Sequence, residues 1–438
     1  MFKKIFIALT YIILATHKLS ALSLIRDAQT EQYLHKISQP IFTAANLDRQ
    51  IKIHIINDRS INAFVAGGKN IFINTGTITY SNSPLGLIGI IAHETGHITG
   101  SHLARMSLDL QKINTQMALG YIIGIATAVA GRADAGQALI MGSSHIGERQ
   151  FYSHSTKHEE AADEAALKLL DASKISAQGL LEFFGEIKSN EKLYTDQINP
   201  YTRTHPLTND RMNRIQEHLN SSPYTNVLLA ENLLNEFTII KTKLEAFLED
   251  PLVVIENYSS DTEHGKLALV IANHRLGKSK KSLDIFKTIQ NKDSAFMQEL
   301  KGQIQYESGM SVAAVKTLLE VEKQLPDISL VKIELAAAII SAKKIELYKM
   351  AIAKLNQALI TETDNVTGWR YLARLYHLTQ NQGLSLLSLA EAEFFAANYD
   401  LALKYANSAK KILKKENQQG SIIRAEDIIK FSKEKKDV

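Results

Sequence analysis

The sequence contains no cysteine, and this absence excludes disulfides, thiolate metal sites and a cysteine nucleophile. Aromatic residues make up only 7% of the chain, with a single tryptophan, so no platform for stacking nucleic-acid bases is evident. The 50 basic and 46 acidic residues nearly balance, and no basic stripe carries the formal net charge of +4. Nucleic acid is therefore not an expected partner, and any metal site must be built from histidines and carboxylates.

Long apolar runs are also scarce, and the first one lies at the N-terminus. Lys3 and Lys4 precede an almost wholly apolar run over 5–15, and Ala21 offers a small residue for cleavage. This order is typical of a secretory signal, and the run is shorter than the ~20 residues that a spanning helix needs. We expect residues 1–21 to be a cleaved signal peptide, with an uncleaved anchor as the alternative, and the mature chain to work in the periplasm.

A second apolar stretch covers residues 117–131 and is interrupted by glycines. Its length of ~15 residues falls below that of a membrane span, and Arg132 and Asp134 follow directly. We interpret it as a buried or flap-like helix, with membrane contact as the open alternative. A membrane-embedded protein would require several longer apolar segments, and none follows the signal.

The N-terminal part of the chain contains a few patterns typical of strands. Residues 51–55 alternate like a strand with one buried face, and the short β-prone runs 62–65 and 71–73 flank Gly67 and Gly68. These two runs predict a hairpin or a pair of adjacent strands. A small β-sheet is therefore expected before the helical part of the chain.

Helical patterns dominate from Pro84 onward. The 438 residues, 45% hydrophobic and 22% charged, are enough for about two to three domains. Ser221, Ser222 and Pro223 form the best boundary. We therefore expect one domain over 22–222 and a helical domain over 223–438, in a fold that is α+β but mostly α.

The helical domain contains an approximate internal period. Three groups of small and apolar residues have the spacing found in tetratricopeptide repeats: Gly302, Ala314, Leu318 and Pro326; Trp369, Leu372, Ala373 and Tyr376; Ala390, Ala402, Ala406 and Ala409. Small residues let the two helices of a repeat approach closely, and larger ones fill the gap to the next pair. The period predicts an α-solenoid that binds peptides or proteins on a concave surface, with a generic helical bundle as the alternative.

The segment that carries chemistry is His93-Glu94-Thr95-Gly96-His97. On a helix, His93 and His97 leave the same face about one turn apart and can share one zinc ion. Glu94 lies beside the first ligand, where it can take the proton of a water molecule that zinc makes acidic. The pattern alone is short and has an appreciable false-positive rate, so a helix with two solvated or core histidines is the alternative.

Neighbouring residues strengthen the zinc hypothesis. The residues just before the motif are apolar, so the helix is expected to be buried, where unpaired histidine and glutamate would be costly. Glu159 and Asp163 lie four residues apart, so Glu159 can complete the zinc site while Asp163 fixes the tautomer of a ligand imidazole. His205, before Pro206 in a later loop, can approach the open zinc position.

With these residues in place, the sequence resembles metallopeptidase family M48, in the periplasmic BepA-like branch that carries a tetratricopeptide tail. The resemblance covers nearly the whole mature chain. The stretches that carry it are 23–27, 62–68, 73–76, 93–97, 159–163 and 204–207, together with Arg211. The resemblance implies a gluzincin-type zinc protease domain followed by the repeat domain.

The resemblance also implies roles for individual residues. His93, His97 and Glu159 match the family's zinc ligands, and Glu94 matches its general base. His205 matches a histidine that occupies the fourth zinc position at rest and stabilises the oxyanion when it is displaced. One further segment matches an edge strand on which an extended substrate pairs by β-addition, and its residues are Asn70, Ile71, Phe72, Ile73 and Asn74.

These patterns favour a zinc endopeptidase of the periplasm, free or peripheral to a membrane. Family resemblance implies that it degrades misfolded or stalled envelope and outer-membrane proteins, with the repeats binding substrate or an outer-membrane assembly complex. The alternative is a periplasmic chaperone or adaptor with a mostly latent zinc site. Glu94 argues against this alternative, because a structural zinc site needs no base.

Overall fold

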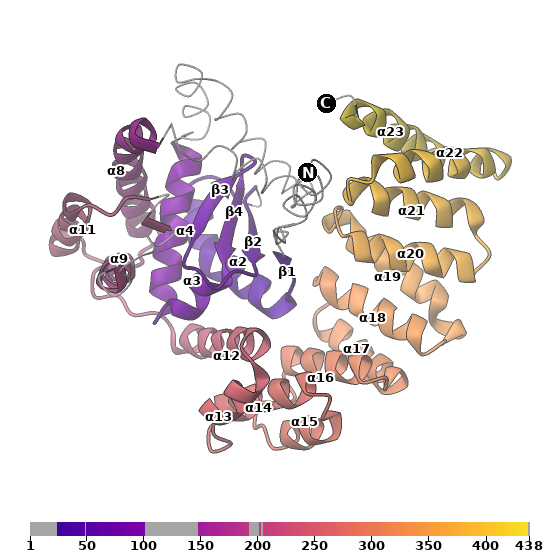
Figure 1. Cartoon of the computed structure of the whole chain (residues 1–438), viewed down its shortest axis with the longest axis horizontal. Helices are drawn as coiled ribbons and strands as arrows, with labels where there is room; N and C mark the ends of the chain where they lie inside the picture. Colours follow the sequence, from indigo (N-terminus) through magenta and orange to yellow (C-terminus); the bar gives the residue numbers. More distant parts are fainter. Residues whose placement is uncertain (1–23, 49, 101–147, 192–200, 203–204, 437–438) are drawn as a thin grey trace, which may run out of the picture. The chain divides into compact units, whose positions relative to one another are not determined.

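A computed structural model of the chain describes residues 24–48, 50–100, 148–191, 201–202 and 205–436 (Figure 1). The expected signal peptide, 1–21, and the apolar stretch 117–131 lie outside these residues. Among the helices that are described, none combines the length and the apolar character needed to cross a bilayer.

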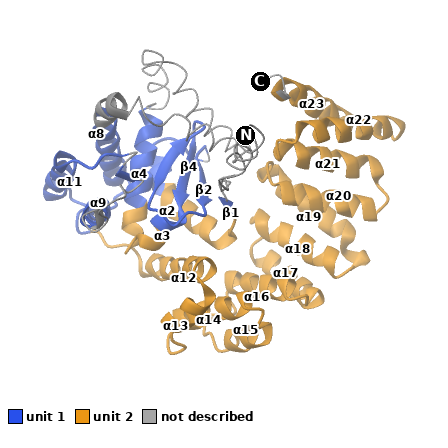
Figure 2. Cartoon of the chain, in the orientation of Figure 1, with its two compact units in different colours: residues 1–25, 40–77, 88–226 blue, residues 26–39, 78–87, 227–438 orange. Residues whose placement is uncertain are grey.

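The chain forms two compact units, which do not follow sequence order (Figure 2). Unit 1 consists of residues 1–25, 40–77 and 88–226, and unit 2 consists of residues 26–39, 78–87 and 227–438. Unit 2 therefore includes two short segments from the part of the chain that was expected to form the first domain.

Unit 1 contains a four-stranded mixed sheet in the order β1-β2-β4-β3. The strands are β1 (Leu24–Ile25), β2 (Lys52–Ile56), β3 (Ala63–Ala66) and β4 (Asn70–Asn74). β2 and β4 are parallel, whereas β1 is antiparallel to β2 and β3 is antiparallel to β4. Gly67 and Gly68 have φ angles of 58° and 89°, which a tight turn between β3 and β4 requires and which glycine adopts without strain. The expected strands and the expected hairpin are therefore present.

The expectation that residues 70–74 form an edge strand is wrong. β4 pairs with β2 on one side and with β3 on the other, so its backbone is occupied along both edges. Among the described residues, β3 is the outer strand at this side of the sheet. The hairpin turn places β3 outside β4, and the parallel pairing with β2 decides which arm of the hairpin is internal.

The helix that carries the histidine motif, α4 (Pro84–Thr99), is fixed by close contacts with two other helices of unit 1, α8 (Glu148–Ala172) and α9 (Gln178–Glu191). A Cβ atom on Gly96 would lie 2.6 Å from the carbonyl oxygen of Ala162 in α8. A Cβ atom on Gly89 would lie 2.7 Å from Cβ of Leu180 in α9. Because both positions are glycine, α4 approaches α8 and α9 more closely than side chains would allow. Three further helices contribute to unit 1. α11 (Asn209–Ser221) lies wholly within it, and α2 (Ala28–Ala44) and α3 (Thr75–Tyr80) lie partly within it.

Unit 2 is built from consecutive helices, each packed on its neighbours in sequence. They are α12 (Glu231–Leu248), α13 (Pro251–Asn257), α14 (Glu263–Arg275), α15 (Ser279–Phe286), α16 (Ala295–Glu307), α17 (Ser311–Gln324), α18 (Ser329–Ser341), η1 (Ile345–Leu347), α19 (Tyr348–Thr361), α20 (Val366–Leu378), α21 (Gln382–Phe395), α22 (Tyr399–Lys415) and α23 (Gln419–Lys436). Their buried residues form separate clusters along the chain, as expected when each helix pair packs on the next pair. The predicted fold class, mostly helical with a small sheet and a helical C-terminal region, is confirmed.

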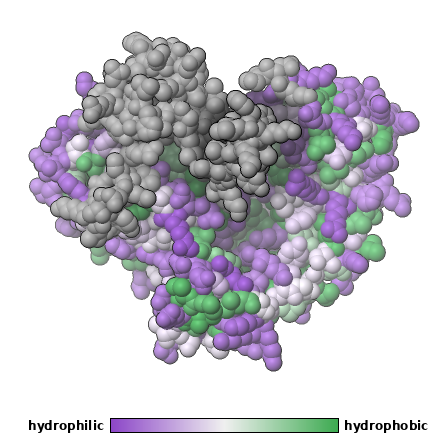
Figure 3. Space-filling model, viewed as in Figure 1, coloured by the Kyte–Doolittle hydropathy of each residue, from purple (hydrophilic) through white to green (hydrophobic). Residues whose placement is uncertain are grey.

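The predicted small positions of the helical unit are packing positions. A Cβ atom on Gly302 would lie 2.6 Å from the side chain of Leu318, and Ala314 is fully buried beside them. Ala390, Ala402, Ala406 and Ala409 are also fully buried. The assignment of these helices to tetratricopeptide repeats stays a prediction. Apolar side chains also gather on the surface over α13 (Figure 3), where Leu252 is 63% exposed.

The first turns of α2 belong to the helical unit and are held there by ion pairs. The Arg26 guanidinium lies 2.8 Å from Glu31 through Nε and 2.7 Å from Glu362 through Nη2. Asp27 caps α2, because its Oδ1 accepts hydrogen bonds from the backbone N–H and the hydroxyl of Thr30. Unit 2 is therefore completed by residues that precede it by about two hundred positions or more in the sequence.

A buried group of charges lies behind Asp27. Nζ of Lys243 is 2.5 Å from Asp27 and 3.7 Å from Glu299, and the side chains of Lys243 and Glu299 are almost fully buried. Burial and the neighbouring charge of Glu299 hold the pKa of Glu334 well above its ordinary value, and burial also raises the pKa of Glu299. One lysine cannot balance the negative charge of all these carboxyl groups. The two glutamates therefore share a proton.

Candidate metal centre

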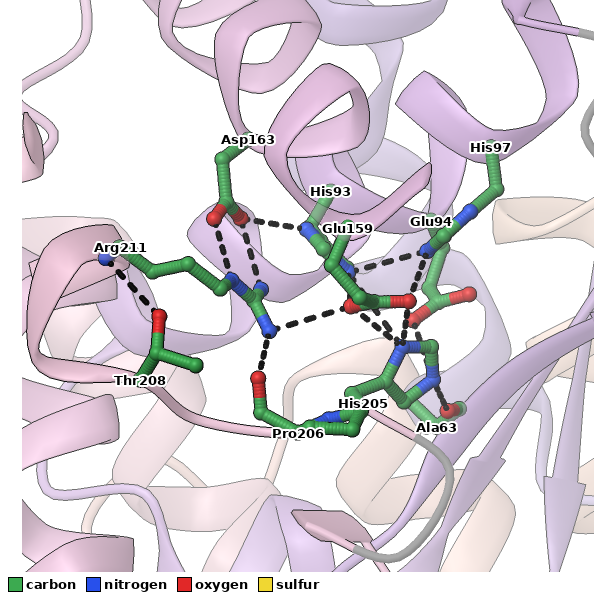
Figure 4. A network of polar contacts seen from close by, with 10 residues as sticks. All are labelled: Ala63, His93, Glu94, His97, Glu159, Asp163, His205, Pro206, Thr208 and Arg211. Atoms are coloured by element: carbon green, nitrogen blue, oxygen red, sulfur yellow. Dashed lines mark hydrogen bonds and ion pairs between the residues drawn. The ribbon is translucent and has the colours of Figure 1, made fainter. Parts of the chain in front are cut away.

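Four potential metal ligands converge in unit 1 from three parts of the chain (Figure 4). His93 and His97 come from α4, Glu159 comes from α8, and His205 comes from the segment before α11. Their ligand atoms all lie within 4.8 Å of one another. Nε2 of His93 is 3.1 Å from Nε2 of His97 and 3.2 Å from Oε2 of Glu159.

Helical spacing explains how these side chains meet. His93 and His97 project from one face of α4 one turn apart, as the motif predicts. Glu159 and Asp163 likewise lie one turn apart on α8 and both point at α4, because Gly96 lets the two helices approach. Glu160, the neighbouring carboxylate, instead pairs with Arg214 at the surface.

The orientation of His93 is fixed by Asp163. Nδ1 of His93 lies 2.8 Å from Oδ1 of Asp163, so this nitrogen donates and Nε2 faces the ligand cluster. Burial lowers the pKa of His93, but hydrogen bonds to Asp163 and Glu159 raise it to about 10. Burial lowers the pKa of His97 to about 3, so its ring is neutral. A metal ion that binds here must therefore displace a proton from His93.

Arg211 is a functional residue to which sequence reasoning assigned no role. Its guanidinium donates two hydrogen bonds to Asp163, of 2.5 Å from Nε and 2.9 Å from Nη2, and Nη1 lies 3.2 Å from Glu159. The side chain is 1% exposed and lies over the ring of Phe184. Thr208 caps α11 and places Arg211 in the first turn, where the helix dipole disfavours a cation. That unfavourable position was the signal in the sequence that this arginine has a partner elsewhere.

Glu94 is fully buried on α4, next to the ligand cluster. In the described part of the chain neither of its carboxylate oxygens has a hydrogen-bond partner, and Oε1 lies 3.5 Å from Nε2 of His205. Burial raises the pKa of this carboxyl. A buried carboxylate without hydrogen bonds is costly unless a group outside the protein completes its surroundings.

The residues of the cluster fit a divalent transition metal. Three imidazoles and one carboxylate converge on one point, which is a donor set that such ions prefer. Glu94 lies beside these ligands without being one of them. It is positioned to act as a general base toward a water molecule. The structure thus brings together all six residues that the sequence nominated for the centre: His93, Glu94, His97, Glu159, Asp163 and His205.

His205 closes the cluster from the opposite side to α4. Its Nδ1 lies 3.0 Å from Oε2 of Glu159 and 3.5 Å from Nε2 of His93. Its Nε2 donates to the carbonyl oxygen of Ala63, the first residue of β3, at 3.2 Å. Burial lowers the pKa of His205, but the charges of Glu159 and Glu94 raise it overall. The outer strand β3 therefore contacts the centre through Ala63.

Two histidines one turn apart, a third ligand from another helix and a buried glutamate beside the first histidine define a metal-dependent peptidase. Residues 28–219 match the sequence model described as "Peptidase family M48". Residues 28–219 thus carry a peptidase family M48 domain, and the chain is a metalloprotease.

The alignments with known relatives cover either most of the chain or less than half of it. The chain is 22% identical over 395 residues to the Beta-barrel assembly-enhancing protease of Escherichia coli (strain K12), which covers 88% of this chain and 80% of the relative. The protein of the same name from Yersinia pestis is 22% identical over 84% of this chain and 76% of its own length. The Mitochondrial metalloendopeptidase OMA1 of Schizosaccharomyces pombe is 23% identical over 43% of this chain and 53% of its own length.

Proposed function

We propose that this protein is a zinc-dependent endopeptidase of the periplasm that acts on misfolded or stalled envelope proteins during the assembly of outer-membrane β-barrels. The observation that carries the proposal is the buried Glu94 carboxylate beside the convergent His93, His97 and Glu159. Zinc is the ion that fits this donor set best, because the ligands are two imidazoles and one carboxylate with a fourth position close by. The names of the relatives support the process, and the signal-like residues 1–21 support the compartment.

The residues of the centre divide the chemistry of peptide hydrolysis between them. His93, His97 and Glu159 would hold the zinc ion, which when bound would supply Lewis acidity to the attacking water and to the scissile carbonyl. Glu94 takes the proton of the attacking water and delivers it to the leaving nitrogen. Its raised pKa suits both steps, because the carboxyl must first accept and then release that proton.

We infer that the substrate binds as an extended strand along β3. Among the described residues, β3 is paired only on the side that faces β4. Its first residue, Ala63, lies within hydrogen-bond distance of His205 through its carbonyl oxygen. A strand added along the side of β3 that faces away from β4 would satisfy backbone groups without regard to side-chain identity. This mode of binding suits an enzyme whose substrates are unfolded segments.

The position of His205 indicates a latent resting state. Its Nδ1 faces the point on which the other three ligands converge, so it can take the fourth position that a water molecule needs. We expect His205→Ala to relieve this block and to give excess self-cleavage and faster casein cleavage. Unchanged or lost activity in this variant would argue that His205 is not an inhibitory ligand.

The helical unit supplies surface for substrates or for an outer-membrane assembly complex. It carries large exposed apolar side chains, among them Leu228, Ile345 and Ile360 at 88%, 73% and 75% exposure. A chaperone or adaptor with a latent zinc site would also use such a surface. The buried base Glu94 favours the peptidase, because binding alone requires no base.

The test is zinc content and casein cleavage, measured side by side for the wild type and Glu94→Gln. We expect one zinc per chain in both proteins and cleavage only in the wild type. Full cleavage by Glu94→Gln would remove Glu94 as the base. The chaperone would be favoured if the intact, zinc-loaded wild type binds unfolded protein but cleaves nothing, and if the His205→Ala variant also cleaves nothing.

A further inference from the structure

Tyr201 makes two contacts with His205 that no pattern in the sequence predicts. The two ring centroids are 4.8 Å apart, with 31° between the ring planes. The backbone N–H of His205 donates to the carbonyl oxygen of Tyr201 at 2.7 Å. Both the backbone and the imidazole of His205 are therefore held by the same residue.

Tyr201 is itself fixed in the protein interior. Its side chain is fully buried, and its ring lies 6.1 Å from the rings of Phe183 and Phe184 on α9. Phe184 in turn lies under the Arg211 guanidinium and 6.3 Å from the ring of His93. A series of aromatic ring contacts thus extends from α9 through Tyr201 to the His205 imidazole.

The polar contacts of His205 are made through its ring nitrogens, and its ring also lies 5.3 Å from the rings of His93 and His97. Glu159, Glu94 and the carbonyl of Ala63 approach the ring nitrogens, and these partners change when a metal ion or a substrate binds. The contact with Tyr201 is made between the two rings, at a centroid distance of 4.8 Å. A ring contact of this kind does not depend on which partner the ring nitrogens have.

We propose that Tyr201 is a positioning residue that keeps the His205 imidazole in the fourth ligand position and so sets the degree of latency. This inference rests on the latent state proposed above and adds the residue that enforces it. Without the ring, a void of aromatic size would lie against His205. The imidazole could then rotate away from the ligand cluster into that void.

The test uses full-length protein loaded with Co²⁺, whose visible absorption reports the ligands of the metal. Tyr201→Leu should move the spectrum toward that of His205→Ala and raise casein cleavage about two- to tenfold, the factor to which a ring contact of this kind converts. Tyr201→Phe keeps the ring and should retain the wild-type spectrum. In a His205→Ala background, Tyr201→Leu should add nothing, since the residue acts through His205.

A matched control is Tyr33→Leu, the same substitution at another buried tyrosine. Tyr33 stacks on Phe237 and donates to the carbonyl of Leu233, all within unit 2. Its loss should lower stability and leave the cobalt spectrum unchanged. If Tyr201→Leu fails to fold, Tyr201→Met fills more of the volume and is expected to give the same spectral shift.

Three results would overturn the proposal. The first is a wild-type spectrum and wild-type cleavage in Tyr201→Leu or Tyr201→Met while His205→Ala changes both. The second is an equal effect of Tyr201→Leu with and without His205, which would make Tyr201 a packing residue only. The third is a wild-type spectrum and rate in His205→Ala itself, which would remove the latent state and with it this role of Tyr201.

Discussion

Arg211 and Asp163 form a buried pair in which two guanidinium nitrogens meet two carboxylate oxygens, at 2.5 and 2.9 Å. The same carboxylate accepts the hydrogen bond from Nδ1 of His93 at 2.8 Å. One aspartate therefore links an arginine on α11 to a metal ligand on α4. We expect the metal affinity of the centre to depend on this geometry, because the hydrogen-bond partners of a ligand histidine set both its tautomer and its direction.

Arg211→Lys should weaken metal binding about 10- to 100-fold. A lysine cannot donate two parallel hydrogen bonds, so Asp163 would lose its fixed orientation and His93 would lose its own. Competition with a chromogenic chelator measures the zinc affinity. Arg214→Lys is the matched control, because Arg214 pairs with Glu160 at the exposed surface. Equal affinities in the wild type and Arg211→Lys would contradict the positioning role.

Gly96→Ala should separate the two helices that supply the ligands. The added Cβ would lie 2.6 Å from the carbonyl oxygen of Ala162, and a backbone atom cannot rotate away. We expect the free energy of unfolding to fall by about 1–3 kcal/mol and zinc affinity to fall with it. Gly185→Ala on α9 is the control, since its Cβ would meet only Met212 at 4.0 Å. A stable, zinc-binding Gly96→Ala protein would show that this close approach is not required.

Lys243→Met should destabilise unit 2 by about 3–5 kcal/mol, because it leaves buried carboxylates without their cation. Asp27 and Glu299 are the groups that lose it. Urea unfolding of the metal-loaded protein, followed by circular dichroism, measures the change. Lys36→Met removes an exposed ion pair with Glu236 and should cost no more than about 1 kcal/mol. Similar losses in the two variants would contradict the buried cluster as a source of stability.

Glu334 should make stability fall as the pH rises. Its pKa is raised in the folded protein by burial and by Glu299, so the folded state holds a proton that the unfolded state releases above about pH 4.5. This contribution is fully present below the unfolded pKa and is lost as the pH rises through the folded pKa. As the pH rises from about 4.5 through the raised pKa of Glu334, Glu334→Gln should therefore lose less stability than the wild type. The exposed Glu346→Gln should follow the wild type, and a Glu334→Gln curve parallel to the wild type would refute the shared proton.

Much of the centre could be predicted because its residues are related by local spacing. His93 and His97, and likewise Glu159 and Asp163, are four apart, and a helix converts that spacing into a shared face. Arg211 and Tyr201 escaped prediction because their roles depend on how α8, α9 and α11 cross, which no local pattern encodes. The strand at 70–74 was expected at an edge because the family resemblance implies one there, and the local pattern does not correct this, since both arms of a hairpin alternate alike. Only the distant pairing with β2 decides which arm is internal.

The ion pair between Arg26 and Glu362 joins residues 336 positions apart. During synthesis the N-terminal residues of α2 are made early, whereas their partners on α12, α16 and α19 are made much later. A nascent chain can therefore pair Arg26 with the nearby Glu31 early, but it lacks Lys243 for Asp27 and Glu362 for Arg26 until those residues have been made. Any chain that stops before residue 362 lacks the distant partner of Arg26, so incomplete copies of this protein should be open to degradation in the way that misfolded proteins are.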